Sequence, residues 1–222
     1  KALRPTEGKV AQVAALPYDV VNREEAAAIG KENPDSFLHV DRAEIDLPAD
    51  TDLYDKRVYQ MARENLLRME KRGILVQDEK PCYYIYELVR RGKSQTGIVG
   101  CASIDDYLNG VVKKHELTKP EQEQDRIDHM DVCDANTGPI YFACRYTEAL
   151  AAFLEQWKNE HKAVCDFTEE DEITHRVWVI DQDNAIDLVR TEMEKIPAFY
   201  IADGHHRAAS AVKVGLKRRQ EN

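Results

Sequence analysis

The sequence is poor in cysteine, and its few cysteines lie far apart. Five occur in 222 residues, without a Cys-x-x-Cys pair, at Cys82, Cys101, Cys133, Cys144 and Cys165. An odd number of widely spaced cysteines argues against a disulfide framework and against a cysteine-based zinc site. We therefore expect reduced thiols, as in the cytoplasm.

Long apolar runs are absent as well. No run approaches the roughly 20 residues that a helix needs to cross a bilayer. Residues 1–20 contain Arg4, Glu7, Lys9 and Asp19, which argue against the apolar centre of a signal peptide. These observations predict a cytoplasmic protein without a membrane partner.

An excess of basic residues, which nucleic-acid-binding proteins usually carry, is also missing. Lysine and arginine number 31 against 41 aspartates and glutamates, so the formal net charge is −10. Nucleic acids and anionic membranes both attract basic surfaces, so this charge argues against either as the main partner. With 43% hydrophobic and 32% charged residues, the composition is that of a folded protein rather than a disordered or fibrous one.

The chain does contain an alternation of helical and extended patterns along its length. Helices are predicted within residues 22–33, 50–72, 147–161 and 184–195, in the second part of 113–137, and from about residue 205 onward. Strands are predicted at 36–40, 83–90, 96–104, 139–145, 175–181 and 197–202. This mixture predicts an α+β fold, with residues 1–222 as a single unit. Because the chain begins with Lys1 and ends inside a predicted helix, we expect it to be the N-terminal part of a longer protein.

The strongest local signal for a ligand site is the sequence Asp-Gly-His-His-Arg at residues 203–207, between a strand and a helix. The first amide groups of a helix lack internal partners, and the helix dipole is positive there, so such an end accepts an anion readily. Gly204 allows close approach to the backbone, and Arg207 offers a bidentate guanidinium. The alternative is a capped helix with solvated side chains. No metal site is predicted, because His205 and His206 are adjacent and diverge on a helix.

A second polar cluster follows residue 112 and contains His115, Glu116, Thr118 and Arg126. It offers an acid/base pair and phosphate ligands, although a solvated charged loop is the alternative. His115 and Glu116 are not part of a His-Glu-x-x-His zinc motif, because Lys119 occupies the fourth position. A third cluster, around Asp19 and Glu24, can serve either as turn and capping residues or as site carboxylates.

Several motifs, in a fixed order, resemble one protein family. They are ALPYDVV at 15–21, NPDSFLHV at 33–40, GVVKKHELT at 110–118, Asp125-Arg126, and DGHHRAASA at 203–211. In this order they resemble the bacterial and archaeal family called domain of unknown function 1015, some of whose members are labelled SpoOJ/ParA/ParB/RepB family proteins. The resemblance covers nearly the whole chain.

The DGHHR turn also looks like the phosphate-binding corner of the ParB/sulfiredoxin superfamily. That resemblance implies a mixed sheet with flanking helices and insertions, and phosphate contacts at Gly204, His205, His206 and Arg207. Asp203 and His205 match the form seen in its serine-kinase-like branch. The implied ligands are ATP or ADP, with Mg²⁺, and a small metabolite. A sulfiredoxin-like reduction is disfavoured, because no cysteine lies beside the corner.

The leading hypothesis is therefore phosphotransfer from a nucleotide to a small hydroxyl metabolite such as serine. Glu116, His115 or Glu24 would take the hydroxyl proton, and Asp203 would hold Mg²⁺ or the substrate amine. The residues assigned to substrate binding are Asp19, Lys113, Thr118 and Arg126. This requires His115, Glu116 and Arg126 to lie near the DGHHR corner. The alternatives are a ParB-like nucleotide-binding regulator without turnover, and a plain interaction domain.

Overall fold

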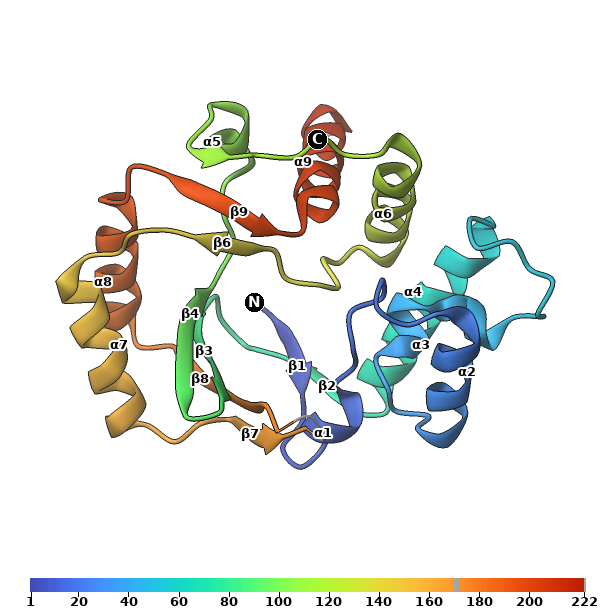
Figure 1. The fold of residues 1–222 in the computed structure, drawn as a ribbon, viewed down its shortest axis with the longest axis horizontal. Coiled ribbons are helices and arrows are strands. Elements are labelled where there is room, and N and C mark those ends of the chain that lie inside the picture. Colours follow the sequence, from blue (N-terminus) through green and yellow to red (C-terminus); the bar gives the residue numbers. More distant parts are fainter. Residues whose placement is uncertain (170–171, 222) are drawn as a thin grey trace.

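The fold consists of several small sheets and the helices that pack beside them. The computed structural model describes residues 1–169 and 172–221, and within them the fold is mixed α+β (Figure 1). The helices are α1 Val10–Val13, α2 Arg23–Glu32, α3 Leu38–Asp41, the 3-10 turn η1 Ala43–Asp46, α4 Lys56–Lys71, α5 Ile104–Leu108, α6 Pro120–Cys133, α7 Glu148–Glu160, α8 Asp183–Glu194 and α9 His205–Glu221. The strands are β1 Leu3–Pro5, β2 Leu75–Gln77, β3 Tyr83–Arg90, β4 Lys93–Val99, β5 Val112–Lys113, β6 Tyr141–Ala143, β7 Cys165–Thr168, β8 Thr174–Ile180 and β9 Phe199–Asp203.

The largest sheet is antiparallel, with strand order β4-β3-β8-β7. The predicted hairpin is confirmed: β3 and β4 are joined at Arg91 and Gly92, which both have positive φ. Such a turn matches the twist of the flanking strands. Helices α7 and α8 cover one face of this sheet (Figure 1). Their core contains Ile85, Trp157 and Val189, all buried.

A three-stranded sheet with the order β5-β9-β6 leads to the candidate site. Its central strand β9 pairs in parallel with β5 and antiparallel with β6, and the chain then turns into α9. Val112, Ile201 and Ala208 form the buried core between this sheet and α9. Because β5 and β9 are parallel, the segment that follows β5 leaves the sheet at the same end as α9 begins.

Helices α2, α3 and α4 form a separate helical region, whose core includes Val40, Ala62 and Leu66 (Figure 1). Helix α6 lies between α4 and α9 and contacts both. The capping box predicted at Asn22 and Glu25 is confirmed, with reciprocal bonds of 2.9 Å. No helix in 1–169 or 172–221 is long and apolar enough to span a bilayer.

Three predictions about the elements need correction. The second strand of the hairpin was predicted at 96–104, but β4 runs from Lys93 to Val99 and α5 begins at Ile104. Residues 36–40 were predicted as a strand, but Leu38–Asp41 form a short helix whose end is marked by the 2.8 Å bond from Arg42 N to Leu38 O. A short apolar run has no periodicity that separates a strand from a buried helix turn. Helix α4 begins at Lys56 rather than near residue 50, because the Asp55 side chain accepts from Arg57 N and caps it.

Candidate functional site

The corner between β9 and α9 has the backbone geometry of an anion site. Gly204 has φ +88°, a left-handed conformation that other residues adopt only with strain. An added Cβ at this position would meet Ile140 at an ordinary 3.5 Å, so the backbone angle, not crowding, requires glycine here. Helix α9 carries no acidic residue in its first turn, so no carboxylate of its own neutralises the positive helix end.

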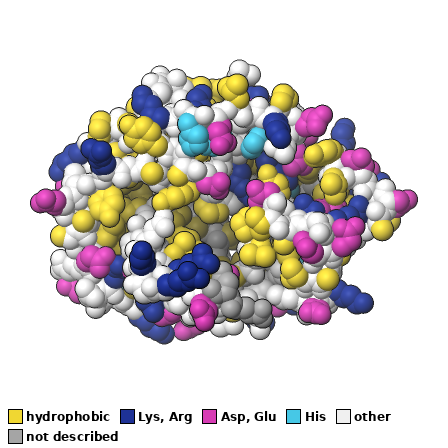
Figure 2. Space-filling view, viewed as in Figure 1, with side chains coloured by type: hydrophobic (Ala, Val, Ile, Leu, Met, Phe, Trp, Pro, Cys, Tyr) yellow, Lys and Arg dark blue, Asp and Glu magenta, His cyan; other side chains and the backbone are white. Residues whose placement is uncertain are grey.

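Two histidines and a glutamate meet at this corner. The ring of His205, whose side chain is 5% exposed, lies edge-on to that of His115, with centroids 4.4 Å apart. Glu116 lies between them: its Oε2 is 3.6 Å from His205 Nδ1 and its Oε1 is 3.7 Å from His115 Nε2. We call His115, Glu116 and His205 the histidine corner. Figure 2 shows histidine side chains beside carboxylates on this face of the molecule. The proximity of His115 and Glu116 to the DGHHR turn, predicted from the motifs, is present.

The remaining residues around the corner join α9 to the segment before α6. His206 Nε2 accepts from Lys119 N at 3.0 Å. The Thr118 hydroxyl donates to Glu123, which also pairs with Lys213 of α9. Thr118 and His206 are therefore occupied by contacts that hold the two segments together.

Lys113 and Asp203 are exposed at the ends of their strands. Lys113 lies on β5 opposite Tyr200, and Asp203 ends β9 directly before Gly204. The ammonium of Lys113 lies near Gly110, before β5, so of the two only Asp203 adjoins the turn.

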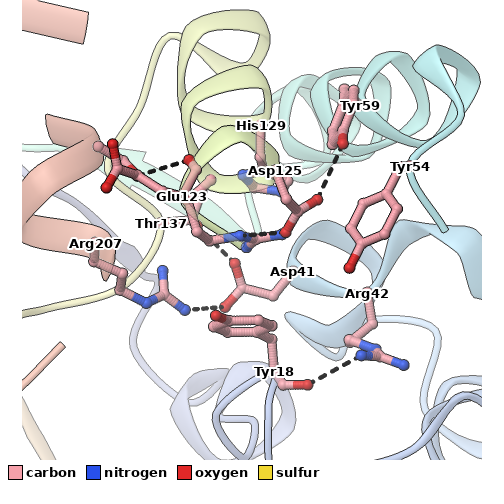
Figure 3. A network of polar contacts seen from close by, with 12 residues as sticks. Tyr18, Asp41, Arg42, Tyr54, Tyr59, Glu123, Asp125, His129, Thr137 and Arg207 are labelled. Carbon is pink, nitrogen blue, oxygen red and sulfur yellow. Dashed lines mark hydrogen bonds and ion pairs between the residues drawn. The ribbon is translucent and has the colours of Figure 1, made fainter. Parts of the chain in front are cut away.

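Arg207 turns the other way, into a buried cluster between α3, α6 and α9. Its Nη2 lies 3.6 Å from Asp41 Oδ2, and Asp41 also accepts a 2.6 Å bond from the Thr137 hydroxyl. Figure 3 shows Arg207 and Thr137 converging on Asp41, with Tyr18 alongside. The Tyr18 ring lies 4.9 Å from the Arg207 guanidinium carbon.

The guanidinium carbon of a second arginine, Arg126, lies 4.3 Å from the centre of the same tyrosine ring. Nε and Nη2 of Arg126 lie 2.8 and 2.7 Å from Asp125 Oδ2. The Tyr59 hydroxyl donates to Asp125 Oδ1 at 3.0 Å. We call Tyr18, Asp41, Asp125, Arg126 and Arg207 the arginine cluster. Arg126 therefore lies near the corner, as predicted, but inside this cluster.

Burial sets the electrostatics of the arginine cluster. Burial opposes the charge of Arg126, whose side chain is 7% exposed, yet the neighbouring Asp125 carboxylate raises its pKa overall. Burial also raises the pKa of the Tyr18 hydroxyl, although the positive charges of Arg126 and Arg207 act in the opposite direction. Nearby His129 donates from Nε2 to Val40 O at 2.9 Å, and burial followed by the charge of Arg126 lowers its pKa. His129 is therefore held neutral.

The arginine cluster leaves little free volume. A cavity of about 10 Å³, bordered by Arg126, Thr137, Gly138 and Arg207, has room for one water molecule. A side chain at Gly138 would collide with the Arg207 guanidinium. Arg126 and Arg207 are thus closely packed, although Nη1 of Arg126 is buried without a hydrogen-bond partner among the described residues, whereas Glu116 and His115 of the histidine corner are exposed.

Two predicted site residues lie elsewhere. Asp19 is exposed, next to Tyr18 of the arginine cluster. Glu24 is exposed in the first turn of α2, in the helical region that Figure 1 shows well apart from α9. The structure brings together His115, Glu116 and His205, but it does not bring Glu24 to them.

Sequence reasoning missed Tyr18 and Asp41 as members of the cluster. Tyr18 stands inside the motif ALPYDVV, and Asp41 directly follows NPDSFLHV. The motif order was thus the signal that pointed to both.

Taken together, the chain is a mixed α+β protein whose polar motifs gather around the start of its last helix. The family model described as "Protein of unknown function (DUF1015)" matches residues 1–222, and the chain belongs to this family. No curated protein and no solved structure matches it significantly. The family resemblance drawn from the motifs is confirmed, whereas the link to the ParB/sulfiredoxin superfamily stays a prediction.

Proposed function

We propose that the protein is a nucleotide-binding enzyme that transfers a phosphoryl group from ATP or ADP to a small hydroxyl metabolite such as serine. One observation carries the proposal: the helix end that follows Gly204, with no acidic residue in its own first turn, lies directly beside the His115–Glu116 pair. Phosphoryl transfer needs anion binding and a proton acceptor in one place, because the protein contributes mainly positioning and electrostatics.

The phosphate cradle consists mainly of backbone. The amide groups of His205 and His206 belong to the first turn of α9, where helical amides lack internal partners. Gly204 keeps the approach to them open, because it has no side chain. This is the part of the fold for which we propose the ParB/sulfiredoxin-like arrangement, with β9 as the strand before the corner.

Arg207 plays a supporting part in this proposal. Its guanidinium is paired with Asp41 inside the arginine cluster and points away from the corner. Its positive charge still lies in the first turn of α9 and adds to the potential of the helix end. The backbone amides, rather than Arg207, therefore supply the main phosphate contacts.

The proton acceptor comes from the corner. Glu116 is 60% exposed and lies beside both histidines, so a substrate hydroxyl has access to it. Glu24 lies in another region, and the geometry favours Glu116 over it. Asp203, exposed beside the turn, is placed to hold Mg²⁺ or a substrate amine.

The experiment is a turnover assay with a set of donors and acceptors. The protein is incubated with ATP, ADP or CTP and a panel of hydroxyl amino acids, and phosphorylated products are detected by mass spectrometry. We expect phosphoserine or a related product, and a loss of about 100-fold or more in kcat for Glu116→Gln, the scale of general base catalysis. Glu24→Gln is measured in parallel to separate the two candidates. Glu148→Gln, an exposed glutamate at the start of α7, is the matched control.

Each outcome has a defined meaning. Nucleotide binding without product from any acceptor would contradict the enzyme and favour a nucleotide-binding regulator. Loss of kcat in Glu24→Gln but not in Glu116→Gln would contradict the placement of the active site at this corner.

A further inference from the structure

The histidine corner combines ligand types that the sequence pattern did not suggest as a set. His115 and Glu116 follow β5, and His205 opens α9, so they meet only because β5 and β9 are parallel neighbours. One potential ligand atom from each of the three side chains lies within 4.8 Å of the others. We propose that His115, Glu116 and His205 bind a divalent transition-metal ion of the zinc class.

The spacing of the three groups supports a metal rather than a hydrogen-bonded network. The two nitrogen–oxygen separations are 3.6 and 3.7 Å. Direct hydrogen bonds would bring these atoms to about 2.7–3.2 Å. Two ligands around a tetrahedral Zn²⁺, each about 2.0–2.1 Å from the ion, stand about 3.4 Å apart. The two separations are therefore close to those of metal ligands, and all three candidate ligand atoms lie within 4.8 Å of one another.

His205 is the buried member of the three, being 5% exposed. Its Nδ1 is the nitrogen that faces Glu116, and its other ring nitrogen, Nε2, has no hydrogen-bond partner within the described residues, so both nitrogens are available to a ligand. A buried polar atom without a partner is rare in proteins and often marks an ion or water site. In the same corner Glu116 is 60% exposed, so an ion can enter from solvent.

The donor set indicates which ions fit. Two imidazoles and one carboxylate, with the remaining coordination position open, are the ligands of catalytic zinc sites. Imidazole suits zinc, copper, iron or nickel, whereas Mg²⁺ prefers oxygen ligands and retains its waters. The ion at this corner is therefore distinct from the Mg²⁺ that would accompany a nucleotide.

The role of this ion in the reaction rests on the proposed function. A hydroxyl bound to a divalent metal ion loses its proton more easily, because the ion stabilises the alkoxide. Glu116 would then hold the ion through one carboxylate oxygen and accept the hydroxyl proton on the other, while the ion would stabilise the alkoxide that forms.

The test measures metal binding to the chain alone, without nucleotide. The protein is stripped with a chelator and titrated with Zn²⁺ against a competing indicator, and with Co²⁺ while the absorption spectrum is recorded. We expect one ion per chain and a tetrahedral Co²⁺ spectrum. Mg²⁺ in large excess should not displace the ion.

Variants decide whether these residues are the ligands. His115 and Glu116 are both 60% exposed, so His115→Ala and Glu116→Ala are expected to fold. Each should weaken Zn²⁺ binding by at least about tenfold, since loss of even an outer partner has effects of this size. His161→Gln, a histidine outside the corner, should leave binding unchanged. His205→Ala is informative only with an unchanged circular dichroism spectrum.

The results separate this inference from the proposed function. Equal Zn²⁺ affinity in wild type, His115→Ala and Glu116→Ala would overturn the metal site. Nucleotide turnover at full rate in protein stripped of transition metal and supplied with Mg²⁺ alone would overturn the role of the ion in activating the hydroxyl, while the proposed phosphotransfer stands. Metal binding without any nucleotide binding would leave the metal site in place and contradict the proposed function.

Discussion

Two polar regions start from the same turn of α9 and differ in how their charges are held. In the histidine corner, an exposed Glu116 stands 3.6 and 3.7 Å from two imidazoles. In the arginine cluster, the buried Arg126 holds Asp125 at 2.7 and 2.8 Å. His205 and Arg207 are only two positions apart, yet one faces a ligand-accessible corner and the other a packed interior.

The difference has a physical reason. Charges removed from water must be paired at close range, because their desolvation is otherwise uncompensated. Exposed groups are under no such constraint and can remain separated. The close Arg126–Asp125 pair is therefore expected to contribute to the fold. Glu116, which is 60% exposed, remains accessible, and for this reason we propose ligand binding at the histidine corner.

The largest expected effect is on the buried ion pair. Asp125→Asn removes the negative charge that Arg126 contacts and leaves a buried guanidinium unpaired. Breaking a buried pair in this way costs about 3–5 kcal/mol of unfolding free energy, measured by urea denaturation. Asp187→Asn, in an exposed pair with Arg190, should change it by less than about 1 kcal/mol. Similar effects for both variants would remove the distinction between the two regions.

The next effect concerns the turn that opens the corner. Gly204→Ala places a side chain at φ +88° and should cost about 1–2 kcal/mol in stability. Gly97→Ala is the control, since Gly97 lies on β4 with open space where the Cβ would be. If both substitutions have the same effect on the denaturation midpoint, the backbone of Gly204 is not constrained as described.

A smaller effect is expected from pH. His129 is buried and its pKa is lowered, so the unfolded chain binds a proton near pH 6.5 that the folded protein does not. The neutral His129 therefore contributes its whole share of the unfolding free energy above about pH 6.5. This share decreases as the pH falls, by at most about 1.4 kcal/mol per pH unit. His39, whose pKa is raised chiefly by a hydrogen bond to Asp46, acts with the opposite sign. The stability difference between wild type and His129→Gln should therefore shrink from pH 7 to pH 5.5. A constant difference would contradict the buried neutral state.

The smallest effect on stability is expected in the histidine corner. Glu116→Gln alters an exposed side chain and should change the unfolding free energy by no more than about 0.5 kcal/mol. The same variant is expected to reduce turnover strongly. A thermal unfolding curve shifted by several degrees would show that Glu116 supports the fold after all.

Sequence signals within a few residues, such as caps and turns, predicted much of the secondary structure. The pairing of strands far apart in the sequence did not follow from such signals. The capping box at Asn22 and the hairpin around Gly92 depend on neighbouring residues, and both were predicted correctly. The strands β1 and β2 have three residues each and pair across 70 positions, so no periodicity reveals them. The predicted strand at 36–40 is wrong for a related reason, since so short a run is ambiguous.

The candidate site also combines local features that the sequence predicts with long-range contacts that it does not. Gly204 and the start of α9 were visible locally, as a glycine between a strand and a helix. The contact of His115 with His205 was expected from motif order alone. The pairing of Arg207 with Asp41 was not predicted, because it joins residues far apart in sequence and depends on how α6 connects the helical region to α9.

The central claim, that the backbone at the start of α9 binds nucleotide phosphate, is tested most directly by calorimetry on two variants of one residue. His206→Ala and His206→Pro both remove the imidazole, which accepts from Lys119 N, but only His206→Pro also removes the backbone amide. The first turn of a helix tolerates proline, and a hydrogen bond to a charged group contributes about 1.5–3 kcal/mol. We predict that His206→Pro binds ATP and ADP at least about tenfold more weakly than His206→Ala, at equal melting temperature. Equal affinity in the two variants would contradict the account.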